Sequence, residues 1–64
     1  MILLMYDRKT NWMRLVDKFG HLCKDYSLAY DYKENEARKY VEKFTKNYRI
    51  YLIDKDGVVL ETYD

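Results

Sequence analysis

The chain of 64 residues has no proline, only two glycines and a single cysteine. With Cys23 alone, neither an internal disulfide nor a four-thiolate zinc site can form, and such cysteine usage is typical of a reducing compartment. Because the two glycines lie 37 residues apart, the chain has no glycine-rich phosphate-binding loop. The sequence therefore predicts no cofactor of the nucleotide-binding kind and no structural metal.

An excess of charge of one sign is also missing. Twelve Lys and Arg residues stand against eleven Asp and Glu, which gives a formal net charge of +1. A DNA mimic would be acidic and a phosphate-tracking module basic, so neither class fits the whole chain. The longest apolar run, Met1 to Tyr6, is far shorter than the roughly 20 residues that span a bilayer and lacks the flanks of a signal peptide. We expect a soluble, cytoplasmic protein with no membrane partner.

Apolar and aromatic residues are abundant: 48% of the chain is apolar and 17% is aromatic, including eight tyrosines. This composition is typical of a folded domain rather than of a disordered segment. A chain this short buries only about 60% of its unfolded surface, so its core has to be rich in large side chains. The length leaves room for a single domain over residues 1–64.

An internal repeat organises the chain. Residues 15–26 align with residues 52–63, with Leu, Asp, Lys, Gly and Tyr recurring in register. In the second copy, Asp54-Lys55-Asp56-Gly57 separates two runs of β-branched and other apolar residues, which predicts a hairpin with strands at about 48–53 and 58–63. Asp accepts local backbone hydrogen bonds in such a turn, and Gly takes positive φ.

The first copy allows two interpretations. By analogy with the second copy, Asp17-Lys18-Phe19-Gly20 is a turn between strands at about 11–16 and 21–26. The same segment also carries apolar residues at helical spacing, with Thr10 or Asn11 available as an N-cap, so an amphipathic helix over 11–19 is the alternative. The repeat favours the hairpin.

The clearest helix lies between the copies, at about 33–46. Ala37, Tyr40, Val41 and Phe44 form one apolar stripe, and Asp31 followed by Glu34 resembles a capping box. Residues 1–6 read as a further strand, and residues 28–32 as a strand extension or a connector. We predict an α+β fold, in which an antiparallel sheet of four to five strands carries one α-helix on one face in the order hairpin, helix, hairpin. The other face would be wet or open to a partner.

Catalytic and metal sites are hard to build from these residues. His21 and Cys23 would share a strand face, but an active thiolate also needs a base held by a third group, and this is the only histidine. Cys23 aligns with Leu60 in the repeat, which favours a core position. Asp54-Lys55-Asp56-Gly57 resembles the start of a calcium loop, but Val58 stands where the third ligand belongs. We predict no enzyme activity, no catalytic residue and no metal.

The tyrosines are the remaining clue, because a small domain has difficulty burying eight phenol hydroxyls with partners. Exposed Tyr and Arg are typical anchors of protein interfaces, although Tyr also simply favours strands. The predicted partner-binding residues come from the tyrosine-rich stretches and from the second turn: Tyr30, Tyr32, Tyr48, Arg49, Tyr51, Asp54 and Asp56.

The sequence thus favours a small protein-binding module with a host protein or complex as its partner. Phage and mobile-element inhibitors of host machinery, of the anti-CRISPR or anti-restriction kind, have similar size and composition, which is an analogy only. The alternative is a single-stranded nucleic-acid-binding module with bases stacked on Tyr and two basic strips: Arg8, Lys9, Arg14 and Lys18, and Lys39, Lys43, Lys46 and Arg49. A homodimer through an edge strand is a further expectation, since no proline blocks strand addition.

Overall fold

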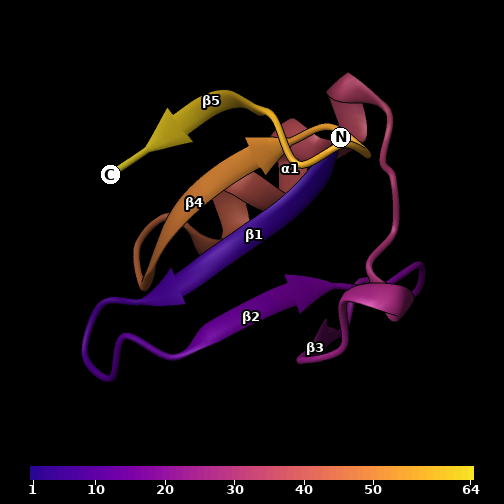
Figure 1. Ribbon diagram of the computed structural model, residues 1–64. Helices are drawn as coiled ribbons and strands as arrows, with labels where there is room; N and C mark the ends of the chain where they lie inside the picture. The colour runs from indigo at the N-terminus through magenta and orange to yellow at the C-terminus, as the bar shows by residue number, and fades with distance from the viewer.

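The structure, a computed structural model, describes all residues 1–64. Five strands form one antiparallel sheet with the order β3-β2-β1-β4-β5, and one helix packs on one face of it (Figure 1). The predicted α+β architecture is therefore confirmed, and residues 11–19 belong to the first hairpin rather than to a helix. The elements along the chain are β1 (Ile2–Asp7), β2 (Met13–Val16), β3 (Leu22–Cys23), the 3-10 turn η1 (Tyr26–Leu28), α1 (Glu34–Phe44), β4 (Tyr48–Ile53) and β5 (Val59–Tyr63).

The two copies of the repeat form turns with the same hydrogen bonds. In the first, the Gly20 amide donates to the Asp17 carbonyl and the His21 amide to the Asp17 carboxylate. In the second, the Gly57 amide donates to the Asp54 carbonyl and the Val58 amide to the Asp54 carboxylate. Both glycines have positive φ, as this turn requires. The sequence repeat thus encodes a repeated turn.

A third turn of related design joins β1 to β2. The Asp7 carboxylate accepts hydrogen bonds from the Lys9 and Thr10 amides, and these bonds lower the pKa of Asp7 below its ordinary value. Asn11 closes the turn with φ at 60°, a conformation that Asn tolerates better than most residues. Each of the three hairpin turns therefore begins with Asp and ends with a residue of positive φ.

The ends of two elements differ from the prediction. The third strand is only Leu22–Cys23, because Asp25 accepts hydrogen bonds from the backbone and hydroxyl of Ser27 and starts η1 instead. The helix begins after Lys33, which makes no side-chain cap hydrogen bond. The expected cap residue, Asp31, lies outside the helix, and its carboxylate contacts the backbone nitrogen of Met1. The prediction that Asp31 caps the helix in a capping box is therefore wrong.

The main core lies between the sheet and α1. Ala37 and Val41, the buried residues of the helix, pack with Leu3, Ile50 and other side chains that alternate along β1 and β4. Because successive strand residues point to opposite faces, Ile2 and Ile53 lie on the far side, where they form a smaller cluster. β1, with the apolar sequence ILLMY, is thus the central strand, with Leu3 and Met5 in the main core and Ile2 in the smaller cluster.

Candidate interaction surfaces

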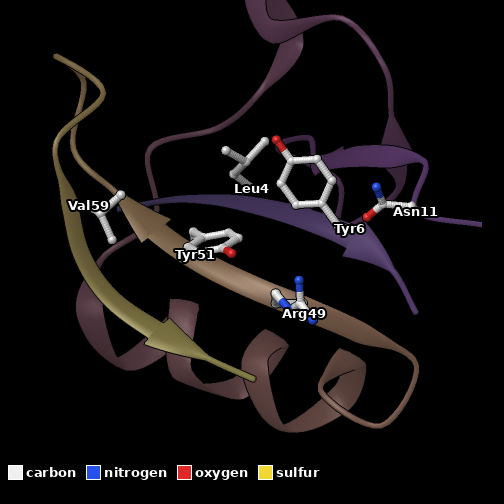
Figure 2. A pocket seen from close by; sticks show the side chains of 6 residues that line it. All are labelled: Leu4, Tyr6, Asn11, Arg49, Tyr51 and Val59. Carbon is white, nitrogen blue, oxygen red and sulfur yellow. The ribbon is translucent and has the colours of Figure 1, made fainter.

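The sheet face turned away from α1 carries an open depression of about 350 Å³. Figure 2 shows its lining side chains, which come from β1, β4, β5 and the β1–β2 turn. The smaller cluster lies beneath this face, and Leu4 and Tyr51 of the depression pack against it. Its lining residues are Leu4, Tyr6, Asn11, Arg49, Tyr51 and Val59.

Two tyrosine rings form the floor of this depression. Tyr6 and Tyr51 lie on neighbouring strands, with their ring centroids 5.9 Å apart in an edge-to-face arrangement. Both are half-buried, as is Leu4 beside them. This geometry favours aromatic pairs and holds both rings in place without covering them. The result is a preformed, apolar surface with an exposed upper side.

Arg49 provides the charge at the border of the depression. Its guanidinium donates to the Asp64 carboxylate at 2.8 Å, and Arg8 approaches the same carboxylate at 3.6 Å. Both Arg49 and Asp64 are solvent-exposed. The ion pair lowers the pKa of Asp64 and raises the pKa of Arg49.

Tyr30 lies on a second exposed surface, beside the β2–β3 turn. Together with Phe19 and Leu28 it borders a depression of about 440 Å³. The backbone bond from the Tyr30 amide to the Val16 carbonyl holds this segment against β2. Phe19 is 71% exposed and Leu28 is 58% exposed, so this surface is apolar and accessible.

Tyr32 is buried, contrary to its selection as a contact residue. Its side chain is 4% exposed, and its hydroxyl donates to the Asp17 carbonyl. Burial, followed by the neighbouring Tyr40 hydroxyl, raises the pKa of Tyr32 above its ordinary value. The expectation that Tyr32 presents its ring to a partner is therefore wrong, since the ring ties the connector to the first hairpin turn.

Tyr32 belongs to a row of aromatic rings that runs along the helix side of the sheet. Ring centroids are separated by 4.9 Å between Tyr32 and Tyr40, 6.3 Å between Tyr40 and Phe44, and 5.9 Å between Phe44 and Tyr48. Tyr48 is thus half-buried at the end of this row, on the opposite face from Tyr51. Aromatic pairs of this kind add to core packing.

The two acidic residues of the second turn differ in role. The Asp54 carboxylate accepts the Asp56 and Val58 amides and so stabilises the turn itself. Asp56 is exposed at the tip. The predicted partner-binding residues therefore lie apart: Arg49 and Tyr51 share one depression, Tyr30 borders another, and Asp54 and Asp56 occupy a turn.

Cys23 packs against the smaller cluster, in agreement with its reading as an apolar side chain. Burial is the main cause that raises the pKa of its thiol, and the nearby Asp17 carboxylate adds to it. A thiol in this setting is a poor nucleophile, because the thiolate is the reactive form.

Lys39 and Lys43 of the second predicted basic strip line one depression on α1, whereas Arg8 and Arg14 of the first strip make separate contacts. Arg8 donates to the Thr45 carbonyl at 3.1 and 3.3 Å, at the end of α1. Arg14 lies over the exposed Trp12 ring at 5.3 Å, as does Lys24 at 5.9 Å. These cations serve separate local contacts on different elements.

Sequence reasoning missed Leu4, Tyr6, Asn11 and Val59 as members of the first depression. The available signal was strand alternation: once β1 and β4 are paired antiparallel, Leu4 lies opposite Tyr51 and Tyr6 opposite Arg49. The register of that pairing is not encoded in either strand alone.

No protein-family model, curated protein or solved structure matches this chain. Neither helical segment has the length and apolar character needed to cross a bilayer.

Proposed function

We propose that this chain is a non-enzymatic protein-binding module that docks a partner on the sheet face turned away from α1. The observation that carries the proposal is the open depression around Tyr6 and Tyr51, with Arg49 at its border. Tyr and Arg are the residues that most often anchor protein interfaces, because they offer large contact areas and directional hydrogen bonds.

The chemistry of the depression defines the partner's contact. An apolar or aromatic side chain of the partner enters between Leu4, Tyr6 and Tyr51, and a carboxylate beside it pairs with Arg49 in place of Asp64. Rigid rings lose little conformational entropy on binding, so this contact favours affinity. The charge at the border supplies orientation more than affinity.

The contacts of five acidic side chains also agree with a binding role without catalysis. Asp7, Asp17 and Asp54 hold hairpin turns, while Glu34 and Glu61 pair with the Arg38 guanidinium. Their oxygens are thereby committed to structural contacts. Stoichiometric inhibition of a host enzyme is the finer form of the proposal and rests on analogy with small phage and mobile-element proteins.

The test is affinity capture from nuclease-treated lysate of the native host, followed by mass spectrometry. Wild-type protein should retain a partner that Tyr51→Ala and Arg49→Glu lose. The matched control is Tyr26→Ala, because Tyr26 is exposed and lies outside the depression. If the captured partner is an enzyme, equimolar wild-type protein should inhibit it and the two face variants should not.

Two results would contradict the proposal. One is retention of the partner by Tyr51→Ala and Arg49→Glu with loss by Tyr26→Ala, which would place the contact elsewhere. The other is capture that disappears after nuclease treatment, together with oligonucleotide binding that falls steeply as salt rises, which would favour the nucleic-acid alternative.

A further inference from the structure

We infer that the Arg8 and Arg49 guanidinium groups together bind a phosphate group, and that this phosphate belongs to a phosphotyrosine side chain of the partner. The inference rests on the proposed function for the partner being a protein, and it deepens that function by naming the preferred anion. Arg8 directly follows β1, and Arg49 lies in β4 opposite Tyr6. Both arginines approach the Asp64 carboxylate.

Arg8 is held in position by the end of α1. Its Nε and Nη2 atoms donate to the carbonyl of Thr45, the C-cap residue of the helix, at 3.3 and 3.1 Å. A basic side chain is favoured at this end, because it satisfies a free carbonyl and opposes the negative end of the helix dipole. The remaining nitrogen, Nη1, makes no hydrogen bond and lies 3.6 Å from the Asp64 carboxylate. Arg8 therefore presents one free donor at a fixed place.

Arg49 has more free donors than Arg8. Of its three guanidinium nitrogens, only Nε donates a hydrogen bond, to Oδ1 of Asp64 at 2.8 Å. Nη1 of Arg8 approaches the same oxygen, so one carboxylate oxygen serves two guanidinium groups. The Asp64 side chain is 69% exposed, and ion pairs in such a setting contribute little free energy. A stronger anion can therefore displace it.

A phosphate group suits these two arginines better than a carboxylate does. A carboxylate has two oxygens in one plane, whereas a phosphate monoester has three terminal oxygens and a charge of about −1.5 to −2 at pH 7. Three oxygens can accept from Nη1 of Arg8 and from both Nη atoms of Arg49 together. Hydrogen bonds between guanidinium and phosphate are charge-assisted and directional, so Arg is common in phosphate sites.

The surroundings of the two arginines carry an excess of positive charge. Two neighbouring depressions, of about 320 and 170 Å³, lie at this end of the sheet. Their charged lining residues are Asp7, Arg8, Lys9, Lys46 and Arg49. The only carboxylate among them, that of Asp7, already accepts two backbone amides of the β1–β2 turn. Once Asp64 is displaced, the local charge attracts an anion, although the net charge of the chain is only +1.

The aromatic part of the ligand follows from the position of Arg49. Tyr6, Asn11 and Arg49 line both the 170 Å³ depression and the open depression of the sheet face, so these two adjoin each other. In Figure 2, Arg49 and Asn11 lie at the end of the open depression away from Val59. The Tyr6 and Tyr51 rings supply an apolar surface beside this end. Phosphotyrosine carries its phosphate at the far end of a ring, which matches this order of ring surface and cations.

The first test is an NMR titration of isotope-labelled protein with phenyl phosphate, which represents the phosphotyrosine side chain. Phenyl phosphate should shift the Nε–H signals of Arg8 and Arg49 and the backbone signals of residues 6–8 and 49–51. It should bind more tightly than inorganic phosphate, which lacks the ring, and more tightly than phenylacetate, which lacks the phosphate. Absence of these shifts at high millimolar phenyl phosphate would overturn the inference.

Three variants test the assignment of residues. Arg49→Gln and Arg8→Lys should each weaken phenyl phosphate binding about five- to tenfold, with circular dichroism to verify folding. Asp64→Asn should strengthen it about two- to fivefold, because the competing carboxylate is removed. The matched control is Arg14→Gln, which removes the same charge from β2, where Arg14 lies over Trp12. Equal weakening by Arg14→Gln and Arg49→Gln would overturn the inference, since it would indicate general charge attraction.

The second test separates this inference from the proposed function. Phosphatase treatment of the host lysate should abolish capture of the partner by the wild-type protein. A partner that is retained after phosphatase treatment and lost by Arg49→Glu would overturn the phosphate assignment and leave the proposed function standing. Capture of no partner, with phenyl phosphate bound as expected, would contradict the proposed function and leave the phosphate site standing. Tighter binding of an oligothymidylate than of phenyl phosphate would overturn the assignment to phosphotyrosine and favour the nucleic-acid alternative.

Discussion

The residues that close the three hairpin turns show how single positions specify the fold. Asn11, Gly20 and Gly57 all have φ between 60° and 85°. They close the turns that begin with Asp7, Asp17 and Asp54, and each of these carboxylates accepts hydrogen bonds from backbone amides. These turns were predictable at 17–20 and 54–57, because Asp and Gly have distinct local roles. Their surroundings differ: a Cβ on Gly57 would meet nothing within 4 Å, whereas one on Gly20 would lie 2.6 Å from the Tyr40 hydroxyl.

We predict that Gly20→Ala destabilises the domain more than Gly57→Ala does. Both changes force a positive φ on alanine, at a cost of roughly 1 kcal/mol. Gly20→Ala also displaces Tyr40, whose ring is packed between Tyr32 and Phe44, so the expected loss is about 2–3 kcal/mol. Urea unfolding of both variants measures the free energies of unfolding.

The Tyr40→Phe background provides the control for this prediction. Without the hydroxyl, the free energies of unfolding of Gly20→Ala and Gly57→Ala should differ less. A smaller difference remains, because two ring atoms of residue 40 still lie 3.3 Å from the added carbon. An equal effect of both alanines in the wild-type background would show that the contact with Tyr40 has no energetic weight.

Exposure of individual tyrosines could not be predicted at this scale. Tyr30 and Tyr32 are two residues apart in similar polar surroundings, yet one is exposed and the other is 4% exposed. The difference arises because the segment between η1 and α1 passes the edge of β2. The Tyr30 amide donates a hydrogen bond to the Val16 carbonyl, and the Tyr32 amide donates one to the Met1 carbonyl. Such long-range pairing has no local signature in the sequence.

At the scale of elements, the interiors of strands and helix were predictable, whereas the ends of β3 and α1 were not. The run of β-branched and apolar residues before the turn at 54–57 placed β4 at its observed bounds. The helix start was predicted to within one residue, but its cap was not: Asp31 was expected, whereas Lys33 occupies the cap position with extended φ and ψ. Lys has no oxygen to accept an orphan amide, and its charge opposes the positive end of the helix dipole.

We predict that Lys33→Ser stabilises the domain by about 1 kcal/mol. A serine hydroxyl at this position can accept a hydrogen bond from the amide of Glu36, three residues on. The Glu36 carboxylate can in turn accept a hydrogen bond from the backbone amide of residue 33. Lys33→Ala is the control, because it removes the same charge and supplies no cap oxygen. Thermal unfolding of both should give a higher midpoint for serine, and equal midpoints would contradict the capping argument.

At the scale of the whole molecule, the sheet separates two roles on its two faces. One face packs against α1 and contains the main core, while the other has a smaller cluster and an open depression. The sequence predicted one covered face and one free face, since a single helix has one stripe to bury. It could not define the depression, because that depends on the register of β1 against β4 and of β4 against β5.

Leu52 and Tyr51 are adjacent in β4 and lie on opposite faces of the sheet, so substitutions at these two positions distinguish the main core from the open face. Leu52 is fully buried against the helix side, so Leu52→Ala should cost about 3–5 kcal/mol, a large part of the roughly 3–10 kcal/mol expected for a domain of this size. Tyr51 is half-buried on the open face, so Tyr51→Ala should cost about 1–2 kcal/mol. Thermal unfolding should give a midpoint more than about 10 °C lower for Leu52→Ala than for wild type. Tyr51→Ala should remain folded at 25 °C, which is the condition that makes it a valid probe of binding. The reverse order of stability would mean that the open face carries the main core, and the docking surface would then have to lie elsewhere.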